Sequence, residues 1–206
     1  MSGFMEAAAT FFRDMFLMAV VAIFLENTIF SRALGTSTSL YLVRKQFSVF
    51  WVGLIMTVII TVASVGAYFL NPLLVKLSFS YYIAPAVYVA VIGIVYIAAL
   101  LITQRFANKR REDILSIIHV SAFNCASLGA ILLATSLTDV TLAGYLGFAI
   151  GSGLGFTLAT YLVRLAYERL SSEDVPAMFR GFPITLIYIG LVSLAIYGLI
   201  GHQLPF

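Results

Sequence analysis

Three long stretches of the chain contain no charged residue, and they decide what it can fold into. Residues 49–70 and 81–102 form two such stretches of 22 residues, and residues 140–163 form the third. An α-helix needs about 20 apolar residues to cross the roughly 30 Å hydrocarbon core of a bilayer. Only 10% of the 206 residues are charged and 62% are hydrophobic, against roughly a quarter and a half in soluble domains. The sequence therefore predicts an all-α integral membrane protein.

Three further apolar segments complete the predicted set of membrane spans. Residues 15–34 are interrupted by polar side chains, residues 114–137 contain His119 and Asn124, and residues 183–200 form an uninterrupted final span. Unpaired polar groups are costly inside a bilayer, so the interruptions indicate broken helices. We therefore expect six transmembrane helices, with the first and fourth broken, in one membrane domain covering residues 1–206.

The positions of the lysines and arginines predict the orientation of the chain. Two of them, Arg13 and Lys76, lie on the side of the N-terminus, whereas ten lie in the connections after spans one, three and five. Because cytoplasmic loops are enriched in positive charge, these three connections should face the cytoplasm. Both termini then lie outside the cytoplasm, in a bacterial cell (inner) membrane. The net charge of +3 reflects this asymmetry and indicates no nucleic-acid partner.

This topology predicts an internal symmetry. The two halves, residues 1–104 and 112–206, start on opposite sides of the membrane, so if they resemble each other they form an inverted repeat. Inverted repeats place binding sites near the bilayer midplane, on broken helices.

The first interruption contains Glu26, Asn27 and Arg32, followed by hydroxyl-rich residues 35–39. Two interpretations of Glu26 stay open. Its carboxylate either pairs with a nearby cation or is protonated, or it belongs to an ion or proton path together with Asn27. Arg32 fits best a residue at the end of a span that extends its charged group toward the interface.

The fourth span holds the only cysteine, Cys125, within the segment Phe-Asn-Cys-Ala-Ser-Leu-Gly of residues 123–129. A single cysteine excludes an intramolecular disulfide. A free cysteine often acts as a small hydrophobic residue, but a thiol between an amide and small residues at bilayer depth is also a candidate metal ligand.

Span five and the connection after it contain candidate contact residues. Gly147, Gly151 and Gly155 recur every four residues, and such stripes allow two helix backbones to approach closely. Whether the facing helix belongs to this chain or to a partner stays open. Asp174 and Arg180, before the last span, are candidates for a loop or subunit contact.

The sequence contains no phosphate-binding glycine loop, no paired histidine or cysteine motif and no soluble domain large enough for a flavin or nicotinamide. Any redox chemistry would therefore be shared with other chains.

Several motifs together resemble the Rnf/Nqr membrane-subunit family. They are Leu-Glu-Asn-Thr-Ile-Phe at 25–30, Leu-Gly at 34–35, Asn-Cys-Ala-Ser-Leu-Gly at 124–129, Tyr-Leu-Gly-Phe at 145–148, and Asp-Val-Pro with Phe-Arg-Gly at 174–181. The chain is most similar to the subunit called A in Rnf complexes and E in the sodium-pumping NADH:quinone oxidoreductase. The resemblance implies two homologous, oppositely oriented subunits that hold an iron or [2Fe-2S] centre between them. Each would contribute two cysteines from its broken helices.

In this resemblance Cys125 matches the fourth-helix ligand, but Ser37 stands where the first-helix cysteine is expected, and Thr38 where a proline follows it. Serine is a poorer ligand for iron–sulfur centres than thiolate. Gly35 and Gly129 would let the backbone approach the centre. Asn124, like Asn27, would satisfy freed backbone groups, and Glu26 would compensate charge or couple an ion.

Two functions follow from these features. The first is an electron-transfer subunit of an ion-translocating complex, relaying electrons across the bilayer with Na⁺ or H⁺ movement. The second is a non-redox relative that acts as a transporter or structural subunit, with Glu26, Asn27 and Asn124 at a polar midplane site. Bound iron that depends on Cys125 would distinguish them.

Overall fold

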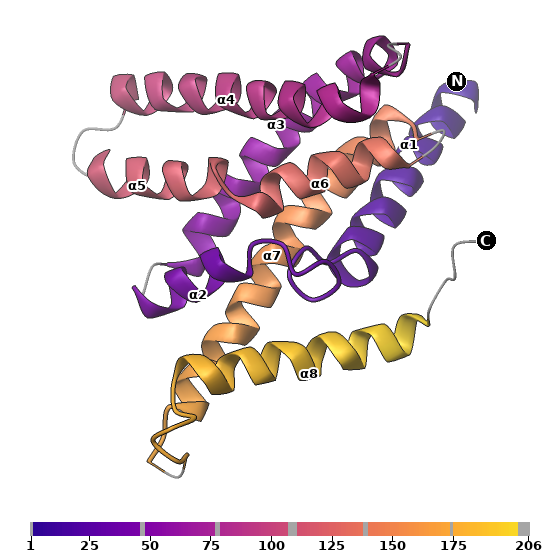
Figure 1. The fold of residues 1–206 in the computed structure, drawn as a ribbon. Coiled ribbons are helices and arrows are strands. Elements are labelled where there is room, and N and C mark those ends of the chain that lie inside the picture. Colours follow the sequence, from indigo (N-terminus) through magenta and orange to yellow (C-terminus); the bar gives the residue numbers. More distant parts are fainter. Residues whose placement is uncertain are drawn as a thin grey trace.

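The computed structural model describes residues 2–45, 48–76, 79–106, 111–137, 140–173 and 175–201, and every regular element among them is a helix (Figure 1). In chain order these are α1 (Ser2–Val20), the π-helix η1 (Val21–Leu25), α2 (Thr36–Arg44), α3 (Val49–Val75), α4 (Ser80–Phe106), α5 (Arg111–Ala122), α6 (Cys125–Ser136), α7 (Leu142–Leu170) and α8 (Phe182–Ile200). The predicted all-α class is confirmed.

The helices also fit the predicted number of membrane spans. Within the described residues, five helical segments are long and apolar enough to cross a bilayer: Phe4–Leu25, Val49–Val75, Ser80–Arg105, Leu142–Leu170 and Phe182–Leu199. A sixth span arises if α5 and α6, which meet at an angle of 45°, count as one broken helix. The chain is thus a multi-pass membrane protein, and its fourth span is bent where the sequence placed Asn124.

The first helix begins earlier than the sequence suggested. We expected a span starting near residue 15, after Arg13 and Asp14, but α1 already begins at Ser2. The two charged side chains form an ion pair with an N–O distance of 3.0 Å, so they neutralise each other and the helix continues through them. The polar residues from Glu26 onward then lie after the helix, in the segment that leads to α2.

Helices α3 and α7 cross at the centre of the bundle, and α1 lies along α7 (Figure 1). Small residues allow the close approach of α3 and α7. A side chain at Gly53 of α3 would overlap Thr157 of α7, and a side chain at Gly153 of α7 would overlap Thr57 of α3. Helix α8 contacts mainly α7 and leaves much of its apolar surface uncovered, including Leu194 at 69% exposure.

The packing of α1 on α7 fixes the depth of the first break. Gly147 faces the backbone of Met15, Gly151 faces Ala19 and Gly155 faces Ile23, so the two helices run in parallel. At a rise of 1.5 Å per residue, Gly155 lies about 20 Å along α7, a helix of roughly 43 Å. The first break therefore lies beside the middle of α7.

Each half of the chain contains a broken helix followed by two long helices, α1–α2 with α3 and α4, and α5–α6 with α7 and α8. This order is the one that an inverted repeat requires, and the repeat itself stays a prediction, as do the boundaries of the two halves.

Candidate functional site

The first break begins where the π-helix η1 ends, and Asn27 satisfies the backbone groups that the break leaves open. Its side-chain oxygen accepts hydrogen bonds from the backbone N–H groups of Ile29 at 3.0 Å and Phe30 at 3.1 Å. Its amide nitrogen donates to the carbonyl oxygens of Ile23 at 2.8 Å and Gly155 at 3.1 Å. Asn27 is 2% exposed, so water cannot reach these backbone groups and the Asn27 side chain provides their hydrogen bonds instead.

The first break ends at Gly35, which precedes α2. This residue has φ 78°, in the left-handed region that favours glycine. A Cβ at this position would lie 2.9 Å from the Cβ of Ala126 and 2.9 Å from a ring carbon of Phe156. Gly35 is therefore required both by its backbone conformation and by the closeness of α6 and α7.

The second break is much shorter and consists of Phe123 and Asn124 between α5 and α6. Asn124 caps α6, since its side-chain oxygen accepts a hydrogen bond from the backbone N–H of Ala126 at 3.1 Å. Cys125 is then the first residue of α6, and its side chain is exposed.

The two breaks meet in space. The backbone N–H of Gly35 donates a hydrogen bond to Sγ of Cys125 at 3.0 Å, although 90 residues separate them in the chain. The hydroxyl of Thr38 donates a long hydrogen bond of 3.4 Å to the side-chain oxygen of Asn124. Gly129, one turn after Cys125, leaves room for the side chain of Leu34. Gly35, Asn124, Cys125 and Gly129, singled out from the sequence, thus lie at one site.

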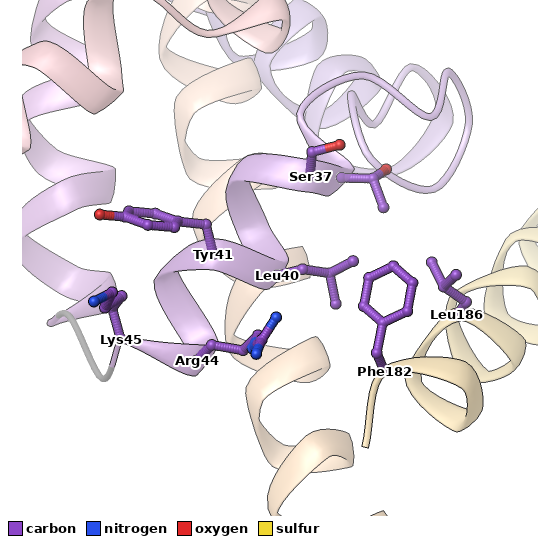
Figure 2. Close-up of a pocket in the computed structure, with 8 residues that line it drawn as sticks. Ser37, Leu40, Tyr41, Arg44, Lys45, Phe182 and Leu186 are labelled. Carbon is purple, nitrogen blue, oxygen red and sulfur yellow. The ribbon is translucent and has the colours of Figure 1, made fainter. Parts of the chain in front are cut away.

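Ser37 lies on the first turn of α2, two residues after Gly35, with an exposed side chain. It faces the groove between α2 and α8 (Figure 2). Ser37 and Cys125 are therefore both accessible side chains at the start of a half-helix.

Glu26 and Arg32 form an ion pair across the first break, with an N–O distance of 2.7 Å. Of the two interpretations of Glu26, this geometry supports pairing with a nearby cation. The Arg32 side chain is 47% exposed and that of Glu26 is 30% exposed, so the pair lies at the surface of this chain, beside the middle of α7.

The glycines of α7 serve a contact within the chain. Side chains at Gly147 and Gly151 would overlap the carbonyl groups of Met15 and Ala19, and one at Gly155 would lie 3.1 Å from Cα of Ile23. The facing helix, left open by the sequence, is α1 with its continuation η1.

Arg180 holds its own loop. Its guanidinium donates hydrogen bonds to the carbonyl oxygens of Glu173 at 3.1 Å and Val175 at 3.1 Å. Asp174, the other candidate for a subunit contact, lies outside the described residues.

Sequence reasoning missed the tyrosine partners of two polar side chains within the spans, His119 and Asn71. The hydroxyl of Tyr96 lies 2.7 Å from Nδ1 of His119, a histidine noted only as a polar interruption. Asn71 links the hydroxyls of Tyr88 and Tyr145 through bonds of 3.1 and 3.2 Å. A single tyrosine in an apolar run resembles any other lipid-facing aromatic residue, so only the fold reveals these pairs.

Where the two breaks meet, Cys125 is suited to be one ligand of a metal centre. Cys125 offers an accessible sulfur that already receives an N–H donor, a feature that tunes iron–sulfur centres. Within the described residues, however, no three His, Cys, Asp or Glu side chains are grouped closely enough to hold a metal ion. The described part of the chain therefore brings no more than two such side chains together at any centre.

Comparison with known proteins agrees with the geometry. Residues 15–202 match the family model described as "Rnf-Nqr subunit, membrane protein". A protein of Actinobacillus pleuropneumoniae, named as the A subunit of an ion-translocating oxidoreductase complex, is 27% identical over 192 residues, covering 91% of this chain and 97% of its own length. Proteins of the same name from Erwinia tasmaniensis and Syntrophotalea carbinolica are each 29% identical, over 90% and 92% of this chain and 95% and 97% of their own lengths. Two half-helices that meet at Cys125 and a match along nearly the whole chain lead to one conclusion: this chain is a member of the Rnf-Nqr family of membrane subunits.

Proposed function

We propose that this chain is a membrane component of an ion-translocating electron-transport complex in a bacterial inner membrane, equivalent to the relatives named as the A subunit of such a complex. The observation that carries the proposal is the hydrogen bond from Gly35 N–H to Cys125 Sγ, which joins the two broken helices at an accessible sulfur. Both termini would lie outside the cytoplasm, as the distribution of Lys and Arg predicts.

In this function Cys125 would supply one thiolate to an iron or [2Fe-2S] centre shared with a homologous, oppositely oriented partner protein. Such a centre, when bound, accepts and releases single electrons. The residues of this chain would set its surroundings. Gly35 donates an N–H to the sulfur, and Asn124 fixes the N-terminus of α6, whose partial positive charge lies at Cys125.

Coupling to Na⁺ or H⁺ movement would fall to Glu26 rather than to Asn27. The hydrogen-bonding groups of Asn27 are engaged by four backbone partners, so this residue has a structural task. The carboxylate of Glu26 is partly exposed beside the middle of α7 and pairs with Arg32. A change of charge nearby could therefore alter that pair.

Ser37 favours a second candidate function. A member of the family that provides one thiol from its two half-helices could retain the scaffold without the centre, as a transporter or a structural component. Glu26, whose carboxylate is partly exposed, would then be the group open to a substrate or ion, and function would not depend on iron.

The test is anaerobic purification of the chain with its co-expressed partner subunits, followed by iron quantification and EPR. We expect bound iron in the wild type and loss of its EPR signal in Cys125→Ser. Ser37→Cys adds a second thiol at the first break and should have equal or higher iron content. Ser136→Cys, which adds an exposed thiol at the far end of α6, is the matched control and should leave iron unchanged. A wild-type complex that assembles and functions without iron would instead support the second candidate.

A further inference from the structure

A groove of about 640 Å³ opens between α2 and the start of α8 (Figure 2). Its size lies within the range of about 300–1,000 Å³ that is usual for ligand sites. Leu40 of α2 and Phe182 and Leu186 of α8 point toward one another and form its apolar part. Phe182 is 50% exposed and Leu186 is 40% exposed, so these side chains do not close the groove by packing.

One end of the groove is positively charged. Arg44 and Lys45 follow each other at the end of α2, and both side chains are exposed. Among the described residues, neither side chain takes part in an ion pair or a hydrogen bond. The two charges are therefore available to an anion.

The charged and apolar residues of the groove lie at different positions along α2 and α8. Ser37 is near the first break, beside the middle of α7, and Arg44 follows about 10 Å further along α2 at 1.5 Å per residue. Phe182 is the first residue of α8, and Leu186 follows one turn later along that helix. The groove thus has its cations at the C-terminal end of α2, and its apolar walls are Leu40 of α2 and the first two turns of α8.

We propose that this groove binds one acidic phospholipid, with its phosphate between Arg44 and Lys45 and an acyl chain along Leu40, Phe182 and Leu186. This site goes beyond the proposed electron transfer and does not depend on a metal at Cys125. Two cations at the end of α2, beside an apolar groove, match the chemistry of an anionic headgroup on a hydrocarbon chain. A free anion would use only the cations, and a zwitterionic lipid would carry no net charge to match them.

The test uses the purified complex of the chain with its partner subunits, delipidated in mild detergent. Dioleoyl-phosphatidylglycerol is titrated, and native mass spectrometry counts the bound lipid. Dioleoyl-phosphatidylcholine and inorganic phosphate are the comparison probes. The variants are the double substitution Arg44→Gln/Lys45→Gln and the charge-preserving exchange Arg44→Lys/Lys45→Arg. The matched control, Arg105→Gln/Arg169→Gln, removes two exposed cations at the ends of α4 and α7.

We expect one phosphatidylglycerol per chain with about 30-fold weaker apparent affinity in Arg44→Gln/Lys45→Gln, since each cation contributes about 1 kcal/mol. The exchange variant and the control should bind as the wild type does. If the double variant does not fold, the single substitutions Arg44→Gln and Lys45→Gln should each weaken binding about fivefold.

Three outcomes would overturn the proposal. Phosphatidylcholine could bind equally well, so that the cations select nothing, or inorganic phosphate could displace the lipid at similar concentrations, which would indicate a site for a free anion. Loss of a partner protein from Arg44→Gln/Lys45→Gln at every lipid concentration would instead make the groove a protein–protein interface.

Discussion

Both helix breaks leave backbone groups without helical hydrogen-bond partners, but the two breaks differ in length and in backbone conformation. The first extends from Glu26 to Gly35 and uses two residues with positive φ, Ala33 and Gly35. The second is only Phe123 and Asn124, and neither has a positive φ. In each, an asparagine satisfies freed backbone groups, and the breaks meet at the sulfur of Cys125.

This difference indicates that the two breaks have different roles. The first break is held by many interactions, which include the four hydrogen bonds of Asn27, the ion pair of Glu26 and Arg32, and the tight fit of Gly35. The second is held by the cap at Asn124, by a buried hydrogen bond of 2.7 Å from the Ser127 hydroxyl to the carbonyl of Ser121, and by weaker contacts, and it exposes the thiol. We infer that the first break stabilises the site and that the second presents the Cys125 thiol. Paired substitutions, one in each break, can test this difference in roles.

The largest difference is expected between Asn27→Ala and Asn124→Ala. The two side chains are buried alike, with 2% and 5% exposure, so burial does not separate them. Asn27→Ala leaves several buried backbone groups without partners, at about 1–3 kcal/mol each, and should lower the free energy of unfolding by about 3–4 kcal/mol. Asn124→Ala removes one helix cap and two long contacts, to Thr38 and to Sδ of Met56, and should cost about 1–2 kcal/mol. Unfolding by SDS in mixed micelles measures both, and equal losses would refute this difference in roles.

The second pair is Gly35→Ala and Gly129→Ala. At Gly35 an added methyl group meets a left-handed φ and two neighbours at 2.9 Å, so we expect a loss of about 2–3 kcal/mol from strain and overpacking. At Gly129 the methyl group would overlap the end of the flexible Leu34 side chain. Helix propensity favours alanine there by about 1 kcal/mol, so the net change should stay within about 1 kcal/mol of zero.

The iron content of the complex provides a second comparison of these two variants. Gly35→Ala shifts the N–H group that donates to Cys125, so it should also reduce the bound iron expected in the proposed function, whereas Gly129→Ala should retain it. If Gly129→Ala destabilised the chain more than Gly35→Ala, the close contact of Gly35 with α6 and α7 would not control this site.

The sequence predicted the fold because the strongest signals were local. The first two charge-free runs lie within α3 and α4, and all but the first two residues of the third lie within α7, where length and hydrophobicity alone specify a membrane helix. The two breaks were also predictable, since Asn27 and Asn124 interrupt apolar stretches. The start of α1 was not, because the mutual neutralisation of Arg13 and Asp14 depends on side-chain geometry.

The geometry of the site required the fold. The hydrogen bond from Gly35 to Cys125 joins residues 90 positions apart, and no spacing in the sequence encodes it. The cationic groove is similar, since Arg44 and Phe182 are brought together only by the return of α8 along the bundle. In the sequence Arg44 and Lys45 appeared only as part of the charge asymmetry that predicts orientation.

The smallest effect is expected for the ion pair of the first break, where Glu26→Gln can be compared with Glu168→Gln. Glu26 and Arg32 pair beside the middle of α7, whereas Glu168 pairs with Arg164 near the end of that helix, at 2.9 Å. An exposed i, i+4 pair contributes about 0.3–0.5 kcal/mol, so Glu168→Gln should change the free energy of unfolding by less than about 1 kcal/mol. Glu26→Gln leaves Arg32 without its partner at greater depth and should cost about 1–2 kcal/mol, because unpaired charge is expensive there. Arg32→Gln combined with Glu26→Gln should recover part of that loss, since no charge is then left unpaired.

Equal effects of Glu26→Gln and Glu168→Gln would show that the first break is as open to water as the end of α7. In the assembled complex, loss of ion translocation in Glu26→Gln with electron transfer retained would indicate that the pair couples the ion as well as holding the break.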